Sequence, residues 1–295
     1  AIMALGTHRP MTEKEMSKKL GEEIAERIEA VNHECEHPES LEDLGKTSKG
    51  TPIFINKTAL KADFMIGVGM ICPHRVAGYG GGAKIVQPGI CGKVTTGHTH
   101  WMSALYEAEK IMGTERNPIR GEMNEIASKA KLGFIINAVL NREGRIVKAV
   151  AGDFIKAFKE GVQESRKVWE VNVPEKADIV IADSHPADID MWQAAKGIYA
   201  SDLIVKPGGT IILITPCPEG VSKQHPQVLK FGYRPFNELK KLVERKEIID
   251  LVAAAHMAHV GRVIREKAKC ILVSEGIPES DALKLGFDYA KTPQE

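Results

Sequence analysis

Three apolar segments in the second half of the chain constrain its fold more than any other feature. They cover residues 178–182, 209–214 and 270–274, and sequence with helical patterning separates them, beginning with residues 189–205. Continuous runs of isoleucine, valine and leucine of this length are typical of strands buried on both faces of a parallel sheet. Parallel neighbours are joined by a long crossover, usually a helix. These β-α-β units predict an α/β fold with mostly parallel sheets.

The first half of the chain carries strands of the same kind. An apolar run at residues 63–70 predicts a buried strand that ends near glycines. Residues 134–140 and 145–151 predict two further strands joined by the turn 141–144. Helical patterning precedes them around residues 100–112 and 117–131. The first half is therefore expected to hold a second α/β core.

The length of 295 residues suits two domains of ordinary size. A helix predicted at 153–170 leads from one half of the chain to the other. We therefore expect an N-terminal cofactor-binding domain over 1–170 and a C-terminal domain over 171–295. The active site is expected in the cleft between them, and the last helix is expected to pack back on the first domain.

The N-terminal residues carry one further expectation. The apolar run at 2–6 predicts a short strand, and Thr12 with Glu15 has the spacing of a capping box, which predicts a helix to about Glu29. Polar residues 32–51 predict a long connection that contains a hairpin. Because no element precedes the first strand, we expect the chain to begin inside its first domain.

Composition excludes several classes of function. The 40 basic and 39 acidic side chains leave a net charge of +1, so the chain has no overall basic field for nucleic acid. No apolar run is long enough to cross a bilayer, so no membrane association is expected. The five cysteines are odd in number and widely spaced, which indicates reduced thiols and a cytoplasmic protein.

Residues 76–84, which we call the glycine loop, follow the strand predicted at 63–70. The loop contains Gly78 and three consecutive glycines at 80–82, and it ends at Lys84. Glycine permits positive φ and close approach of the backbone to a neighbour, so a phosphate-binding loop is one interpretation. The Walker pattern requires serine or threonine after the lysine, whereas Ile85 stands here, and the dinucleotide pattern lacks its last glycine. A glycine-rich turn without a ligand remains the alternative.

Two histidines follow predicted strands. His8 follows the strand at 2–6, and His74 follows the strand at 63–70. Because the carboxyl ends of parallel strands face the ligand crevice, both rings are expected in one site, although an isolated histidine is often structural. His98 and His100 lie two residues apart on a predicted helix and cannot share a face. One of them could supply a single metal ligand.

Gln193 and Lys196 form the third candidate site. They are three residues apart in a predicted helix and should lie on one face of it. The pair could bind a carboxylate, or it could be an ordinary solvated amide and lysine. The sequence leaves both interpretations open.

Taken together, these stretches resemble the lactate racemase family. The resemblance covers nearly all of the chain, and the stretches that carry it are Gly6-Thr7-His8-Arg9-Pro10, Pro73-His74-Arg75 with the glycine loop through Lys84 and Pro88-Gly89-Ile90, Asn117-Pro118-Ile119-Arg120, Ala151-Gly152-Asp153, and Trp192-Gln193-Ala194-Ala195-Lys196-Gly197. The central histidine–glycine–lysine signature is highly specific.

The resemblance implies a 2-hydroxyacid racemase or epimerase that uses a nickel-pincer nucleotide, the nickel complex of pyridinium-3,5-bisthiocarboxylic acid mononucleotide. It implies that Lys84 tethers this cofactor, that Gly80, Gly81 and Gly82 bring the backbone and its amide donors close to it, and that cofactor maturation proteins are partners. His100 aligns with the nickel ligand, and His98 is the alternative if the register shifts.

The remaining roles follow from the same resemblance. His8 and His74 match an acid/base pair that serves opposite faces of the 2-hydroxy carbon, while a hydride passes to the cofactor and returns. Gln193 and Lys196 match residues that orient a small 2-hydroxy acid and its carboxylate.

The chain also departs from the family pattern. An Asp-x-Thr-Arg-Pro motif that the family carries before its first histidine is absent from these residues, and Trp192 stands where tyrosine is usual. The second difference predicts a substrate pocket unlike that for lactate. Two alternatives therefore stay open, namely a relative that binds the nucleotide or a hydroxy acid without turnover, and an unrelated nucleotide-binding α/β enzyme.

Overall fold

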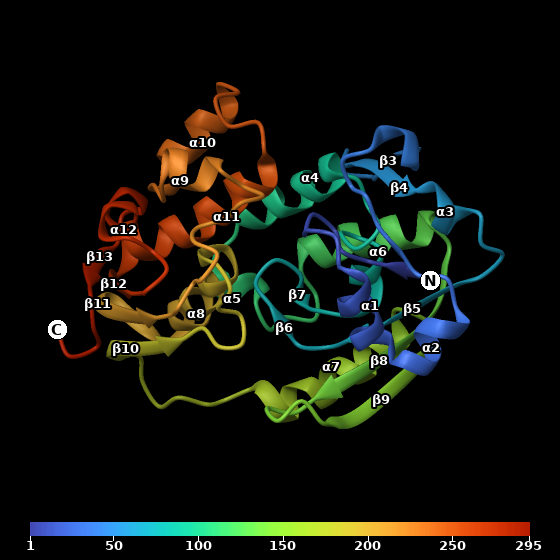
Figure 1. Ribbon diagram of the computed structural model, residues 1–295, viewed down its shortest axis with the longest axis horizontal. Helices are drawn as coiled ribbons and strands as arrows, with labels where there is room; N and C mark the ends of the chain where they lie inside the picture. Colours follow the sequence, from blue (N-terminus) through green and yellow to red (C-terminus); the bar gives the residue numbers. More distant parts are fainter. The chain divides into compact units, whose positions relative to one another are not determined.

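A computed structural model describes residues 1–295 and divides into two compact units (Figure 1). Unit 1 comprises Ala1–Ser103 and Glu109–Glu170, and unit 2 comprises Ala104–Ala108 and Val171–Glu295. Both units are α/β and most of their strand pairs are parallel, which confirms the predicted fold class. None of the helices has the length and apolar character that a membrane span needs.

Unit 1 is assembled from short elements around one three-stranded sheet. Its strands are β1 (Ile2–Met3), β2 (Val31–Asn32), β3 (Leu41–Lys46), β4 (Pro52–Asn56), β5 (Met65–Met70), β6 (Pro73–His74), β7 (Gly78–Tyr79), β8 (Leu132–Leu140) and β9 (Ile146–Gly152). Its helices are α1 (Glu13–Leu20), α2 (Glu22–Arg27), η1 (Pro38–Ser40), α3 (Lys57–Leu60), η2 (Gly82–Ile85), α4 (Lys93–Ala104), α6 (Pro118–Lys129) and α7 (Lys156–Trp169), and α5 (Ala108–Ile111) begins at the boundary of the two units.

The order β5-β8-β9 forms the main sheet of unit 1. β5 runs parallel to β8, and β8 and β9 form the predicted antiparallel hairpin. Gly144 closes that hairpin with φ +74°, and its amide donates to Asn141. Helix α7 packs on β8 and β9, where its Phe158 and Val162 are buried. The pairing of β5 with β8 places the segment that follows β5.

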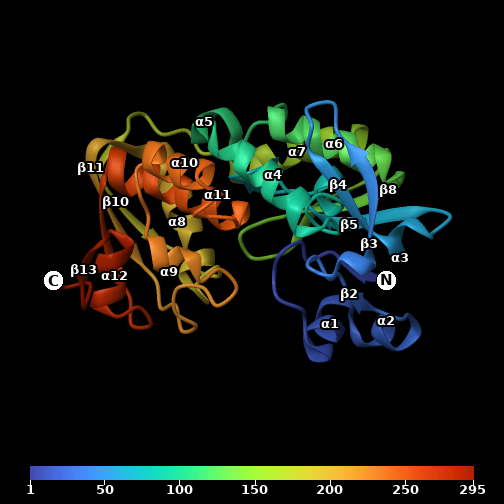
Figure 2. The same ribbon diagram turned by 90° about the horizontal axis from the view of Figure 1, so that it is seen from above.

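The N-terminal prediction is partly correct. Thr12 caps α1 in a complete capping box with Glu15, but the predicted helix to residue 29 breaks at Gly21, whose φ of +86° is incompatible with helix. Two shorter helices result, and α1 and α2 lie beside each other near the amino terminus (Figure 2). The first strand is shorter than predicted and ends at Met3, and the chain turns at Gly6 with φ +59°.

The helix expected at 100–112 is also different in the structure. Helix α4 begins at Lys93 and ends at Ala104, and the short α5 follows it. The hairpin expected within residues 32–51 forms between β3 and β4, so its second strand lies just beyond the predicted segment. These shifts leave the order of the elements unchanged.

Unit 2 is a four-stranded parallel sheet with its strands in chain order. The strands are β10 (Ala177–Asp183), β11 (Val205–Ile214), β12 (Lys269–Val273) and β13 (Asp288–Ala290), and the helices are α8 (Met191–Ile204), α9 (Gln227–Phe231), α10 (Phe236–Glu244), α11 (Leu251–Gly261), the π-helical η3 (Arg262–Lys267) and α12 (Glu279–Leu285). The last helix, α12, packs against α9 and β13.

Chain order in this sheet has a consequence for burial. Because parallel crossovers are almost always right-handed, strands added in sequence place their connecting helices on one face. Val180, Ile211 and Leu213 are buried on that face, whereas Ile179 and Ile181 on β10 are 61% and 69% exposed. The predicted β-α-β unit formed by β10, α8 and β11 is thus confirmed.

Candidate active site

The glycine loop begins in a small hairpin. β6 and β7 pair antiparallel, with Pro73 opposite Tyr79 and His74 opposite Gly78. The chain then enters η2, which carries Lys84, and the Lys84 amide donates to the Gly81 carbonyl at 3.2 Å. The hairpin therefore brings His74 beside the glycines that precede the lysine.

The glycines of the loop are required by contacts with the rest of unit 1. Gly78 has φ +78°, and a Cβ there would lie 2.1 Å from the carbonyl oxygen of Thr114. Gly81 has φ +74°, and its Cβ would lie 2.6 Å from Ile71. Side chains fit neither position, so the loop needs glycine to pack on its own scaffold.

Two amides of the loop are taken by acceptors within the protein. The Gly80 amide donates to Cys72 O at 2.7 Å, and the Gly82 amide donates to Asn137 Oδ1 at 2.8 Å. Asn137 is itself 1% exposed on β8. In this conformation the amides of Gly80 and Gly82 are therefore directed into the protein and are not the cofactor-facing donors that the resemblance implies.

His74 is half-buried and fixed by its own loop. Its Nδ1 accepts hydrogen bonds from the amides of Val76 at 3.1 Å and Ala77 at 3.3 Å. A nitrogen that accepts from two amides carries a lone pair, so the neutral ring holds its proton on Nε2. His74 therefore offers Nε2–H as a donor in this conformation.

This geometry predicts the tautomer of His74 in solution. We expect proton–nitrogen correlation spectra of isotope-labelled protein to show His74 with a protonated Nε2 and a lone pair on Nδ1. His37, an exposed histidine whose Nδ1 lies 3.1 Å from a carboxylate oxygen of Glu39, provides the comparison, because a carboxylate only accepts and therefore favours a proton on Nδ1. A His74 ring protonated on Nδ1 in its neutral form would contradict the two amide bonds.

His8 lies in the loop that follows β1, and it is exposed. Its amide donates to Leu5 O at 3.1 Å, and just before it the Gly6 amide donates to Gly89 O at 2.9 Å. That second bond ties the His8 segment to the residues that follow Lys84. The structure thus brings these two segments together, although they are far apart in sequence.

His98 and His100 both lie on α4, as predicted, and differ in their surroundings. His100 Nδ1 donates to the carbonyl of Thr96 at 2.9 Å, which leaves the lone pair on Nε2 in the neutral ring. The surface of His98 is largely accessible, but desolvation of its covered part and the charge of Lys46 lower its pKa. His100 therefore has the fixed tautomer that a metal ligand needs. The structure contains no group of three or more His, Cys, Asp or Glu side chains arranged so that they could hold a metal ion.

In unit 2 the predicted pair is formed. Lys196 Nζ donates to Gln193 Oε1 at 2.7 Å, so both side chains lie on one face of α8, as the spacing predicts. Asp190 caps this helix by accepting from the Gln193 amide at 2.8 Å, and burial raises the pKa of Asp190. The cap fixes the first turn of the helix, in which Gln193 lies.

An aromatic stack beside this pair was not predicted from the sequence. Trp192 lies between the rings of His225 and His256, with centroid distances of 4.0 and 4.1 Å. His256 bonds to the hydroxyls of Tyr199 and Tyr233 at 2.9 and 3.0 Å, and burial lowers its pKa to about 3. The sequence feature that could have indicated this cluster is His256, which lies within the alanine-rich run of α11. A buried polar ring in such a run must find hydrogen-bond partners.

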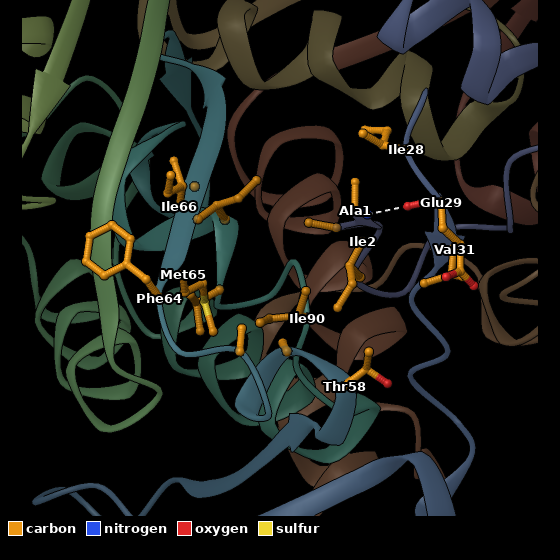
Figure 3. Close-up of a pocket in the computed structure, with 16 residues that line it drawn as sticks. Ala1, Ile2, Ile28, Glu29, Val31, Thr58, Phe64, Met65, Ile66 and Ile90 are labelled. Carbon is orange, nitrogen blue, oxygen red and sulfur yellow. Dashed lines mark hydrogen bonds between the residues drawn. The ribbon is translucent and has the colours of Figure 1, made fainter. Parts of the chain in front are cut away.

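A cavity of about 600 Å³ lies beside the segment that follows Lys84 (Figure 3). Residues of β1, of β5 and of the segment after Lys84 line much of it. Its lining side chains include Ile2, Ile28, Phe64, Ile66 and Ile90. Its lining includes neither the candidate histidines nor Lys84. Because no histidine, lysine or cysteine side chain lines it, we do not assign the chemistry to it.

Two family models match this chain. The model of the lactate racemase N-terminal domain matches residues 1–113, and that of the lactate racemase C-terminal domain matches residues 173–295. Together they span more than half of the sequence. The chain belongs to the lactate racemase family.

Curated relatives and solved structures are consistent with this assignment. Lactate racemases from Thermoanaerobacterium thermosaccharolyticum and Lactiplantibacillus plantarum are each 35% identical over 222 residues, which is 74% of this chain and 52% of theirs. The chain thus spans about half the length of these relatives. The lactate racemase apoprotein from the first organism superposes with a TM-score of 0.88 at 30% identity, over 100% of this chain and 71% of its own. A protein from Thermotoga maritima gives 0.83 at 25% identity, over 98% and 78%.

Proposed function

We propose that this protein is an isomerase, a racemase or epimerase that inverts the hydroxyl-bearing carbon of a small 2-hydroxy acid. The family assignment and the match over the whole chain to a lactate racemase apoprotein support this proposal. Lactate is the first substrate to test, because both curated relatives are lactate racemases. The buried thiols Cys91, Cys217 and Cys270 support a cytoplasmic location.

His8 and His74 are the proposed acid and base. Inversion requires a group on each face of the carbon, one to take the hydroxyl proton and one to return it. Imidazole titrates near neutral pH and can do either. The hairpin that carries His74 and the Gly6–Gly89 bond that anchors the His8 segment both meet the region of Lys84, which supports a shared role.

The residues of unit 1 fit the cofactor that the family resemblance implies. Lys84 would tether the nickel-pincer nucleotide, and its amide bond to Gly81 fixes the turn that carries it. Nε2 of His100 would ligate nickel, since its Nδ1–H is held by Thr96. Gly80, Gly81 and Gly82 would allow close approach along the loop. When bound, this group supplies a hydride acceptor and donor for the substrate carbon.

Gln193 and Lys196 are the proposed ligands of the substrate carboxylate. Lys196 supplies positive charge, and because its bond is to Gln193 Oε1, the amide nitrogen of Gln193 is left as a donor. A carboxylate accepts from both groups, and two donors fix its orientation better than one. Maturation proteins that load the cofactor are the proposed partners.

A non-catalytic relative that binds a nucleotide or a hydroxy acid is the second candidate. The observation that favours it is the hydrogen bonding of His74, whose Nδ1 accepts from two amides and whose Nε2–H suits donation more than proton uptake. Racemisation assays on a panel of 2-hydroxy acids separate the two candidates. Turnover of any member of the panel by the cofactor-loaded protein would exclude the second.

Cofactor loading is tested directly by mass. Protein purified from cells that contain the maturation proteins is expected to carry nickel and extra mass at Lys84, because a covalent tether survives denaturation. Lys84→Arg is expected to lose the adduct, while Lys93→Arg, on the neighbouring α4, is expected to keep it. Intact-mass spectrometry and metal analysis provide the measurement. Wild-type protein with neither adduct nor nickel would contradict the tethered cofactor.

A further inference from the structure

One buried arginine holds the glycine loop. Arg120 is 3% exposed, and its Nη1 donates to the Gly81 carbonyl at 3.1 Å. Its Nη2 donates to the carbonyls of Ala77, at 3.3 Å, and Tyr79. The guanidinium carbon also lies 4.2 Å from the ring centroid of Phe158. Alternate residues of the loop therefore direct their carbonyl oxygens at a single cation.

The surroundings of Arg120 otherwise disfavour a positive charge. Its Nε is buried without a hydrogen-bond partner, and burial lowers the pKa of Arg120 to about 9. The residue lies in the first turn of α6, where the helix dipole favours anions over cations. No carboxylate pairs with it, so the loop carbonyls and the ring of Phe158 are the groups that stabilise its buried positive charge.

The motif Asn-Pro-x-Arg explains how the arginine reaches this place. Asn117 caps α6 by accepting from the Arg120 amide at 2.9 Å, and Pro118 begins the helix. The Asn117 side chain also donates to the Ala77 carbonyl, at 3.4 Å. The cap thus fixes the start of the helix and directs the third helical residue at the loop.

The same contacts extend along the loop toward Lys84. Gly82 packs so closely on Phe158 that a Cβ would lie 2.8 Å from the ring, and the Gly81 carbonyl accepts from both Arg120 Nη1 and the Lys84 amide. A change at the guanidinium is therefore transmitted through one carbonyl to the turn that carries the lysine.

We propose that Arg120 is a positioning residue for Lys84, which fixes the glycine loop in the conformation that presents the lysine amine. The role of this positioning in cofactor attachment rests on the proposed function of Lys84 as the tether. The effect of Arg120 on the loop conformation is independent of that function. Arg120 is too buried to touch a substrate, so it acts through the carbonyls of residues 77, 79 and 81.

The test compares Arg120→Lys and Arg120→Met with Arg145→Met, a matched change at an exposed arginine of the β8–β9 turn. In protein without cofactor, hydrogen exchange is measured for the glycine loop and for residues 132–152. The rate at which an acylating reagent labels Lys84 is measured by peptide mass spectrometry. For both Arg120 variants, we expect exchange in the loop to rise about tenfold or more with residues 132–152 unchanged, and the labelling rate of Lys84 to change with it. The control should match wild type.

Several results would overturn the proposal. The first is an Arg120→Lys variant in which loop exchange and Lys84 labelling both equal those of wild type. One ammonium cannot replace a guanidinium that bridges the carbonyls, so this result would show that the bridge is not needed. An equal rise in exchange in the glycine loop and in residues 132–152 would also overturn the proposal, since it indicates a general loss of stability. If Arg120→Met does not fold, Arg120→Lys decides, and an unfolded Arg120→Lys counts against the proposal.

Cofactor loading separates this inference from the proposed function. In cells with the maturation proteins, Arg120→Lys is expected to carry at least about tenfold less adduct at Lys84 than wild type. Equal adduct in both proteins would overturn the positioning role. An absence of adduct from wild type would instead contradict the tether, and the exchange and labelling results would still decide whether Arg120 positions the loop.

Discussion

Replacing His74 by alanine is expected to lower kcat for racemisation of the accepted 2-hydroxy acid by about 10²- to 10⁴-fold, the usual contribution of a positioned acid or base. His8→Ala is expected to have an effect of similar size. Because enantiomers have equal free energy in water, the equilibrium constant is one, and kcat/KM must fall equally in both directions. Initial rates from each pure enantiomer, followed by chiral chromatography, provide the measurement.

Matched variants separate chemistry from loop structure at His74. The side-chain oxygen of His74→Asn can accept from the Val76 and Ala77 amides in place of Nδ1, but this variant lacks the Nε2–H group. It should therefore keep the loop and lose activity as alanine does. His37→Ala, at an exposed histidine of the same unit, should be fully active. Full activity in His74→Asn would show that the His74 ring takes no part in the reaction. If only His74→Ala then lost activity, the role of His74 would be to maintain the loop conformation.

Gly78→Ala is expected to destabilise the protein by about 3 to 5 kcal/mol. The new Cβ would lie 2.1 Å from the carbonyl oxygen of Thr114, and the residue would hold a φ of +78° that alanine disfavours. Left-handed strain and steric overlap each contribute about 1 to 3 kcal/mol. Backbone oxygen cannot move aside as a flexible side chain can, so the loop must shift. Urea denaturation of the cofactor-free protein measures the change.

Gly144→Ala is the control for Gly78→Ala. Gly144 has almost the same φ, +74°, but no atom lies within 4 Å of the position that its Cβ would occupy. Only the conformational strain remains, and we expect a loss of about 1 kcal/mol. The difference between the two variants isolates the overlap with Thr114. Equal losses would mean that the loop accommodates a side chain at residue 78, contrary to the packing described above.

Local sequence signals predicted much of the fold. Thr12 and Glu15 form the capping box, the turn at 141–144 joins β8 and β9, and α8 lies between the parallel strands β10 and β11. These features depend on residues close in sequence, where turn chemistry and periodicity act directly. The exact ends were less accurate. The break at Gly21 and the early start of α4 depend on one glycine conformation and on packing, which periodicity does not register.

The sequence alone determined the α/β class, the family resemblance, the candidate histidines and the position of Lys84 at the end of the glycine loop, because each of these is a pattern of neighbouring residues. The tertiary structure decided why the loop is rich in glycine and what holds it. Thr114, Phe158 and Arg120 reach it from distant segments. It likewise placed His225 and His256 on either side of Trp192. Such contacts arise only when separate elements pack together, since burial and hydrogen-bond satisfaction are properties of the folded chain.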